Sequence, residues 1–287
     1  MNSPRDLRRR IKSISGTAQI TRAMQMVAAS KMRKAQQAAI DATPFARQFY
    51  RIQRSATLRS PELAHPLLEV RPVRRRAVIL VAADKGLCGA LNTNVFRLAS
   101  QFDPQATLFV TAGRKAAQFV ARSRRQLAAE FPYGDSPTYA EARAIAAFAR
   151  DLFLKGEVDQ VQIVATKFVN TLTQEPVRME YLPVGAITGL QVPGVDETAM
   201  AADTEEAIFE PNARAVLSYL IGHYLNIYIY FVLLSAKASE QSARMVSMKN
   251  ATDSAESLIG ALRLEYNKLR QGNITKELLE IAGGQAG

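Results

Sequence analysis

The feature that most constrains the fold is a repeat of apolar residues in the C-terminal third of the chain, spaced alternately three and four residues apart. An average spacing of about 3.5 residues is typical of the contact seam of a coiled coil. As a single helix at about 1.5 Å per residue, the segment would be roughly 80 Å long. Gln241 and Thr252 are its only frankly polar members. The full repeat is Leu217, Leu220, Tyr224, Ile227, Phe231, Leu234, Ala238, Gln241, Met245, Met248, Thr252, Ala255, Ile259, Leu262, Tyr266 and Leu269.

The N-terminal segment carries the same spacing with smaller residues. Its repeat is Leu7, Ile11, Ile14, Ala18, Thr21, Gln25, Ala28, Met32, Ala35, Ala39, Ala42, Ala46 and Phe49. Pro44 should kink this helix or break it near residue 43, because proline removes a helical hydrogen bond. We therefore expect the two ends of the chain to pair as an antiparallel coiled coil. The alternative is two ordinary amphipathic helices in a bundle.

The middle of the chain has a different pattern, in which apolar, β-branched runs alternate with helical ones. Strands are expected at 75–84, 106–112, 161–169 and 177–182, and helices at 91–102, 114–123 and 140–154. Such alternation predicts a largely parallel sheet with crossover helices. The expected fold class is thus α/β: a coiled coil formed by helices at 1–58 and 207–287, plus a central Rossmann-like domain at 73–195. Segments rich in turn residues, 59–72 and 184–206, would link them.

This topology predicts an unequal pair of helices. If the chain leaves the first helix near residue 56 and enters the last near residue 209, facing positions add up to about 265, and about 25 C-terminal residues lack a partner within the chain. An apolar helical tip of this kind implies burial by another protein. The apolar residues on the tip are Leu262, Tyr266, Leu269, Ile274, Leu278 and Ile281.

Charge and cysteine content limit the class of protein. Residues 1–76 hold 17 Lys and Arg against 4 Asp and Glu, so the net charge of +11 belongs to the first quarter of the chain. A nucleic acid, an anionic membrane or an acidic protein surface would each fit. A nucleic-acid-binding protein of the bZIP type, however, has helices that fork from a parallel dimer, whereas the helices here are expected to pair within one chain.

Cys88 is the only cysteine, which excludes an internal disulfide and fits a reducing compartment. The N-terminus lacks the apolar run of a secretory signal, and helical patterning from Leu7 argues against a cleaved transit peptide.

The uncharged stretch at 215–236 raises the possibility of a transmembrane helix. Three features favour a buried helix instead. The seam runs through the stretch unbroken, His223, Asn226 and four tyrosines interrupt it, and it continues into a charged helix beyond Lys237. A helix that is hydrophobic nearly all round is expected where several elements cover it.

The loop DKGLCGALN after the first expected strand is the main candidate for chemistry. A phosphate-binding loop would have more glycines and a Lys-Ser/Thr pair. A nucleophilic Cys88 would need a base, and His65 and His223 are the only histidines. We expect a strand-to-helix turn in which Cys88 packs as a small apolar residue. No cluster of His, Cys, Asp or Glu has metal-ligand spacing. The prediction is no catalytic, cofactor or metal site.

Three segments of the sequence resemble one family, the gamma subunits of F-type ATP synthases. They are DLRRRIKSISGTAQITRAMQMVAASKMRKAQ, DKGLCGALN and SARMVSMKNATDSAESLIGALRLEYNKLRQGNITKELLEI. The resemblance implies a non-catalytic shaft that couples ion flow to the alpha/beta catalytic sites and contacts the alpha3beta3 ring, the epsilon subunit and the c-subunit ring. It also implies a peripheral position on the cytoplasmic side of a bacterial inner membrane. The rival interpretation is a coiled-coil adaptor or a nucleic-acid-binding protein.

By matching motif positions, the resemblance assigns contacts with alpha and beta to Met24, Arg244, Arg270, Gln271 and Thr275. The sequence also departs from the family pattern. The usual Glu-Ser-Leu before Ala-Ser-Glu reads Ser-Ala-Lys, which ends in Lys237. These departures bear on the fine contacts of the shaft and leave the expected role unchanged.

Overall fold

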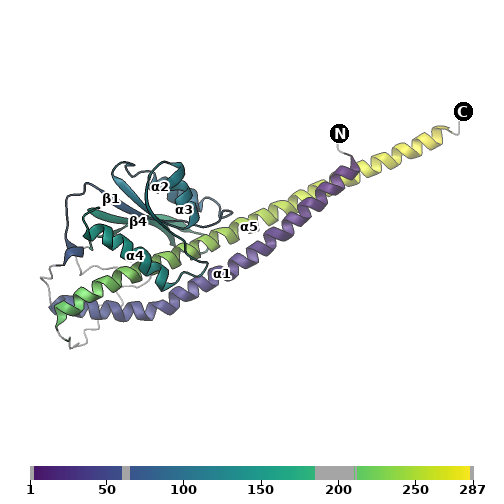
Figure 1. The fold of residues 1–287 in the computed structure, drawn as a ribbon. Helices are drawn as coiled ribbons and strands as arrows, with labels where there is room; N and C mark the ends of the chain where they lie inside the picture. The colour runs from purple at the N-terminus through teal and green to yellow at the C-terminus, as the bar shows by residue number, and fades with distance from the viewer. Residues whose placement is uncertain (1–2, 60–64, 185–209, 211, 285–287) are drawn as a thin grey trace. The chain divides into compact units, whose positions relative to one another are not determined.

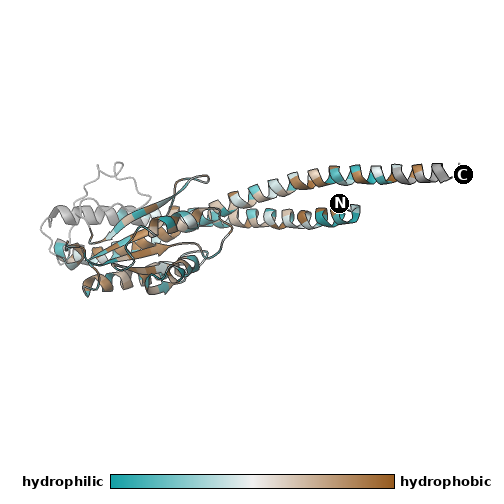
Figure 2. Cartoon of the chain, turned by 90° about the horizontal axis from the view of Figure 1, so that it is seen from above, coloured by the Kyte–Doolittle hydropathy of each residue, from teal (hydrophilic) through white to brown (hydrophobic). Residues whose placement is uncertain are grey.

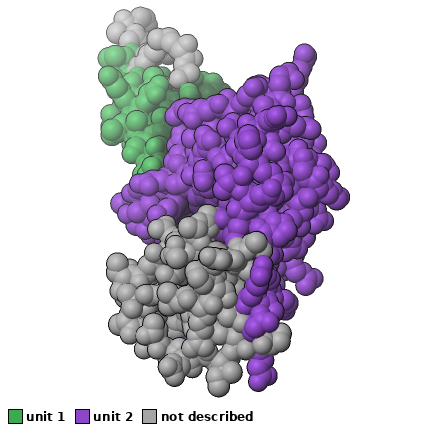
Figure 3. Space-filling model, turned by 90° about the vertical axis from the view of Figure 1, so that its left-hand side faces the viewer, with its two compact units in different colours: residues 1–28, 244–287 green, residues 29–243 purple. Residues whose placement is uncertain are grey.

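The protein is described by a computed structural model that covers residues 3–59, 65–184, 210 and 212–284. The chain divides into two compact units, coloured in Figure 3: unit 1 comprises residues 1–28 and 244–287, and unit 2 comprises residues 29–243. Two linkers were expected. Residues 60–64 of the first, at 59–72, and residues 185–206 of the second, at 184–206, lie outside the described residues. So do the expected end of the central domain at 195 and the expected start of the last helix at 207.

Two long helices form the ends of the chain, as the periodicity predicted. Helix α1 spans Pro4–Arg59, and helix α5 spans Ala213–Gly284 (Figure 1). The break expected near residue 43 does not occur, because α1 continues through Pro44. The hydroxyl of Thr43 donates to the carbonyl of Ala39, one helical turn back, at 2.8 Å.

Unit 2 contains a five-stranded sheet with the order β3-β2-β1-β4-β5. Strands β1 to β4 run parallel and β5 is antiparallel to β4. The four expected strands are confirmed, but β3 was missed and β5 begins at Gln174, earlier than expected. The elements are η1 (Pro66–Leu68), β1 (Arg76–Val81), α2 (Leu91–Ala99), β2 (Thr107–Ala112), α3 (Arg114–Arg122), β3 (Gln126–Phe131), α4 (Tyr139–Leu154), β4 (Gln160–Phe168) and β5 (Gln174–Leu182).

Both faces of this sheet are covered, which explains why β1 reads as a continuous apolar run. Val78 and Leu80 point to one face and pack with residues of α2 and α3. Ile79 and Val81 point to the other, where α4 and the part of α5 in unit 2 lie. Figure 2 shows hydrophobic residues gathered in these layers. The turn from β2 to α3 requires Gly113, which has a φ of +94° and whose side chain, if larger, would clash with the carbonyl oxygen of Ala82.

Part of α5 is long and apolar enough to cross a membrane, by length and composition alone. Its most apolar 18-residue window is 53% buried inside the protein. Residues such as Ile221, Leu225 and Leu233 belong to the core beneath the sheet. Cover by the sheet and α4 therefore accounts for the apolar character of this stretch.

Candidate interaction surface

Unit 1 is an antiparallel pair made by the first turns of α1 and the second half of α5. The buried residues follow the predicted seams: Leu7, Ala18 and Ala28 on α1, and Met248, Thr252, Ile259 and Leu262 on α5. The coiled-coil seam is thus confirmed in this unit. Among the described residues of unit 1, each helix packs against the other alone, so the remaining faces of both helices are mostly exposed.

A polar contact fixes the register of this pair. The hydroxyl oxygens of Thr21 and Thr252 lie 2.7 Å apart. Each hydroxyl also lies within hydrogen-bonding distance of a carbonyl of its own helix, Thr21 at 3.1 Å from Ala18 and Thr252 at 2.9 Å from Met248, so either hydroxyl can donate across the pair. On the exposed flank of the seam, Arg22 forms an ion pair with Glu256. Polar residues at single seam positions commonly set the register of coiled coils.

The observed register corrects the expected overhang. With Thr21 facing Thr252, facing positions add up to about 273 and not 265, so Leu7 lies opposite residue 266 or so. The expectation took the helix ends as residues 56 and 209, whereas α1 ends at Arg59 and α5 begins at Ala213. Leu262 is accordingly 6% exposed and belongs to the paired region. Tyr266 and Leu269, also expected to be unpaired, are half-buried.

A shorter overhang remains beyond Leu269, and its described apolar residues are exposed. Ile274 is 48% exposed, Leu278 61% and Leu279 68%. Figure 1 shows α5 continuing past the start of α1. The side chain of Ile281 lies outside the described residues. Exposed leucines and an isoleucine on one helical tip form a surface suited to burial by a partner.

The residues assigned to partner contacts fall into two groups. Arg270, Gln271 and Thr275 are exposed on the overhang, where the hydroxyl of Thr275 donates to the carbonyl of Gln271 at 2.9 Å. Met24 is half-buried on α1, and Arg244 is only 8% exposed and already interacts within the chain. The structure therefore brings three of the five together on one exposed segment, while Met24 and Arg244 lie elsewhere along the helices.

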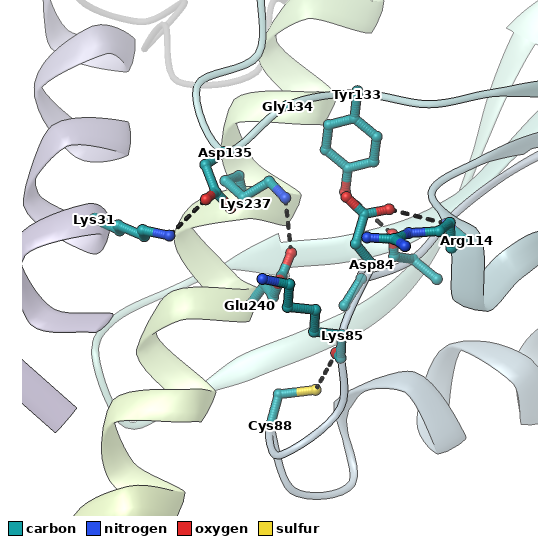
Figure 4. A network of polar contacts seen from close by, with 12 residues as sticks. Lys31, Asp84, Lys85, Cys88, Arg114, Tyr133, Gly134, Asp135, Lys237 and Glu240 are labelled. Carbon is teal, nitrogen blue, oxygen red and sulfur yellow. Dashed lines mark hydrogen bonds and ion pairs between the residues drawn. The ribbon is translucent and has the colours of Figure 1, made fainter. Parts of the chain in front are cut away.

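The turn after β1 has the conformation of a packed strand-to-helix connection (Figure 4). Cys88 is buried with Ala83 and Leu91, and Ala243 of α5 packs against them. Leu87 and Gly89 both have positive φ, near 60°. The thiol of Cys88 lies 3.9 Å from the carbonyl of Lys85 and accepts a hydrogen bond from the Asn92 amide at 3.5 Å. The expected packing of Cys88 as a small apolar residue is confirmed.

The two histidines have other roles. His65 caps η1, where its Nδ1 accepts the backbone N–H of Leu67 at 3.2 Å. Burial lowers the pKa of His65. The ring of His223 packs 4.6 Å from the ring of Tyr219. Among the described residues, no group of three or more His, Cys, Asp or Glu side chains is placed to hold a metal ion.

Helix α5 covers the carboxyl ends of β1 and β4, the two central strands. The hydroxyl of Ser235 accepts the backbone N–H of Phe168, the last residue of β4, at 3.0 Å. After β1, Ala243 packs on the Cys88 turn. In open parallel sheets this edge commonly binds ligands, and here it is occupied by the chain's own helix.

Sequence reasoning missed one polar group, the buried pair of Lys237 and Glu240 on α5. They are 1% and 3% exposed, and Nζ of Lys237 lies 2.9 Å from Oε2 of Glu240. The sequence signal that could have found them is an oppositely charged pair three residues apart, directly after a long apolar run. From the sequence, Lys237 was noted only as the point where the charged part of the helix begins and as the end of a departure from the family pattern.

The fold and the site define a class of protein that combines a Rossmann-like α/β domain with a long antiparallel helix pair, whose described overhang is apolar and exposed. Comparison with known proteins gives the family. The model of the family described as ATP synthase matches residues 3–287. The ATP synthase gamma chain of Opitutus terrae is 45% identical over 99% of this chain and 98% of its own length. That of Methylacidiphilum infernorum is 42% identical over 99% of both. The chain belongs to the ATP synthase gamma chain family.

Solved structures agree in fold. A chain in the rotor of the Euglena gracilis mitochondrial ATP synthase is 20% identical, with a TM-score of 0.65 over 94% of this chain and 98% of that one. A chain in another rotational state of the Euglena enzyme is 17% identical, with a TM-score of 0.66 over 99% of this chain and 93% of that one. At this level of identity the likeness concerns the fold.

Proposed function

We propose that this chain is the central-stalk rotor subunit of an F-type ATP synthase, a non-catalytic shaft that couples ion flow to ATP synthesis. The observation that carries the proposal is the exposed apolar overhang of α5 in a chain of the gamma family. Such a tip needs a partner that surrounds it, and a ring of alpha and beta subunits supplies one. The adaptor and nucleic-acid-binding alternatives receive no support from the comparisons.

The proposed mechanism needs asymmetry and stiffness, with no reaction at the shaft itself. A helix pair presents a different surface in each direction, so three identical catalytic sites around it would make different contacts. An element with different contacts to different conformations shifts the equilibrium between them. Rotation would then carry each site through the cycle in turn.

The proposed partners follow the parts of the chain. The helical ends, 1–58 and 207–287, would contact the alpha3beta3 ring, with Arg270, Gln271 and Thr275 on the overhang and Met24 and Arg244 further along. A contact from Arg244 would require its mostly buried side chain to turn outward. The domain at 73–195 would contact the epsilon subunit and the c-subunit ring. The protein would thereby sit peripherally on the cytoplasmic side of a bacterial plasma membrane.

Co-assembly with alpha and beta subunits from the same genome tests the proposal. The full chain should enter their complex and be required for its ATP hydrolysis. Replacing Ile274, Leu278 and Leu279 by Ser should weaken this assembly, because it removes the apolar tip surface. The matched control replaces Val70, Leu127 and Leu154, exposed apolar residues of unit 2, by Ser. A chain that never enters the complex would refute the rotor function, and equal losses in both variants would refute the role of the tip.

The assigned contacts are tested one at a time. Arg270→Ala should reduce ATP turnover in the assembled complex while leaving folding and assembly unchanged. Arg263→Ala, also exposed on α5 but within the paired region, is the control. Equal turnover in the wild type and in Arg270→Ala would remove Arg270 from the contact surface.

A further inference from the structure

The segment Ala236–Ser242 of α5 is completely buried although most of its residues are polar. Apolar residues of the same helix, such as Leu233 and Leu234, fill the core directly before it. Burying charges carries a desolvation cost that a leucine in the same place would avoid. A role beyond filling space is therefore needed to explain the segment.

Lys237 connects α5 to the ends of two strands. Its ammonium pairs with Glu240 and lies 4.5 Å from the ring centroid of Tyr133, which follows β3. The hydroxyl of Tyr133 donates to the carbonyl of Ala82, just after β1, at 3.2 Å. Desolvation, with a further contribution from Glu240, raises the pKa of Tyr133 well above its ordinary value. The tyrosine thus remains a neutral donor, and Figure 4 shows it between the helix and the strand ends.

Two serines bracket this pair and bind the β4–β5 hairpin. Ser235 accepts the N–H of Phe168 at 3.0 Å, and Ser242 donates to the carbonyl of Thr171 at 2.6 Å. These serines are seven residues apart, so they lie on one face of the helix. We call Ser235, Lys237, Glu240 and Ser242 the polar anchor.

Helix α1 is tied to the same loop that receives Lys237. Lys31 of α1 forms an ion pair with Asp135 at 2.5 Å, two residues after Tyr133. The hydrogen bond from Lys31 lowers the pKa of Asp135 and keeps it charged. The backbone N–H of Gly134 donates to Glu141 of α4 at 3.0 Å, which holds the loop on a rigid helix. The loop Tyr133–Asp135 therefore contacts both long helices of unit 2.

Apolar packing and hydrogen bonds restrain a helix differently. Apolar contacts have no preferred direction, so a helix packed by them alone resists turning about its axis only through the shape of its side chains. Hydrogen bonds weaken steeply when their angle is lost, and the anchor contacts two separate segments of the domain. Ser235 and Ser242 bind the β4–β5 hairpin, and Lys237 lies over the ring of Tyr133 in the loop after β3. Turning α5 by one residue would break both serine hydrogen bonds and move Lys237 off the ring of Tyr133, whereas the pair of Lys237 with Glu240 lies within α5 and would turn with it.

We propose that the polar anchor sets the rotational orientation of α5 against the α/β domain and keeps the helix from turning under torque. The inference rests on the proposed rotor function for its consequence, but the angular restraint itself is a property of the isolated chain. It makes Lys237, Glu240 and Tyr133 positioning residues for energy coupling.

The first test measures orientation in the isolated full chain. In a Cys88→Ala background, spin labels at Tyr219 on α5 and Leu127 on β3, both exposed, report the spread of distances between helix and domain. The variant Lys237→Met/Glu240→Gln should broaden this distribution while the chain stays folded, because removing both charges together leaves no unpaired buried charge. Ser235→Ala/Ser242→Ala is the milder second variant. An unchanged distribution in both would overturn the inference, whatever the chain assembles with.

The second test uses the assembled, membrane-reconstituted complex. Lys237→Met/Glu240→Gln should lose most of its ATP-driven ion pumping while ATP hydrolysis continues. The matched control is Lys155→Met/Glu157→Gln, an exposed pair of opposite charges in the same unit that should pump normally. Normal pumping per ATP in an assembled anchor variant would overturn the role in torque. A wild-type chain that fails to assemble would instead overturn the rotor function, and the label experiment would still decide the anchor.

Discussion

Helix α5 has the same backbone in both units but very different surroundings. In unit 1 it buries a single stripe against one partner helix, and residues between the stripe positions, such as Leu258 and Leu264, are exposed. In unit 2 it is buried on nearly every side, including the seven consecutive residues Ala236–Ser242. A helix with one neighbour keeps its other faces for partners, whereas a helix covered by a domain is held in place. The part of α5 in unit 1 is thus suited to contact partners, and the part in unit 2 is suited to fix the helix on the α/β domain.

The largest effect expected from this comparison is a cavity in unit 2. Leu233→Ala, at a fully buried position, should lower the free energy of unfolding by about 2–5 kcal/mol. Leu262→Ala in the seam of unit 1 should lower the free energy of unfolding by less, because fewer side chains surround Leu262. Leu264→Ala, which is mostly exposed, should stay within about 0.5 kcal/mol of the wild type. Urea denaturation followed by circular dichroism measures all three, and equal losses at Leu233 and Leu262 would break the comparison.

The threonine pair tests whether unit 1 depends on a specific polar contact. Thr252→Val should lower the free energy of unfolding by about 1 kcal/mol, since it removes a hydrogen bond but keeps the shape of the side chain. The double variant Thr21→Val/Thr252→Val should lose less free energy of unfolding than the two single variants lose together. A double-mutant cycle gives the interaction energy, and strict additivity would show that the two hydroxyls act independently.

The pH dependence of stability should carry a contribution from unit 2. Asp159 accepts the backbone N–H groups of Arg75 and Arg74 at 3.0 and 2.8 Å, and these bonds lower its pKa below the ordinary 3.8. This stabilisation is complete above pH 3.8 and is lost as the pH falls through the lower value in the folded state. Asp159→Asn should therefore flatten the acid side of the curve of unfolding free energy against pH, whereas Asp151→Asn, at an exposed carboxylate, serves as control. Parallel curves for Asp159→Asn and the wild type would contradict the assignment.

The smallest effect is expected at the exposed ion pair of unit 1. Arg22→Ala should change the free energy of unfolding by about 0.5 kcal/mol or less, because water screens exposed ion pairs. Any effect should disappear in high salt. A larger loss that persists at high salt would mean that unit 1 is held together by more than its narrow seam.

The sequence predicted the features that depend on local periodicity. The seam positions Met248, Thr252, Ile259 and Leu262 follow from spacing alone, because one neighbour selects one face. The strand β1 was recognisable because RAVILV is β-branched and continuous. Strand β3, QLAAEF, has no β-branched residue, and its pairing with β2 supplies a preference that its own composition lacks.

The features that were wrong or missed depend on distant contacts. The register was misjudged by about eight positions because turn-rich composition does not mark where a helix ends, and this moved Leu262 into the overhang by mistake. The spacing of Lys237 and Glu240 could have been noticed, but the contacts of the anchor could not, since Lys237, Tyr133 and Phe168 come from three separate segments that only the folded sheet brings together. The contact residues Arg270, Gln271 and Thr275 rest on resemblance, and their partners lie in other chains.

The helix lying across the carboxyl ends of β1 and β4 has a pharmacological consequence. Enzymes with a doubly wound sheet offer that crevice to a dinucleotide, and a small molecule competes there with a cofactor. In this chain a compound would compete with α5 itself, through Ser235 and the packing of Ala243 on the Cys88 turn. Its binding would be linked to displacement of the helix and weakened by that cost. A compound that displaced α5 would therefore loosen the packing of the helix on the sheet.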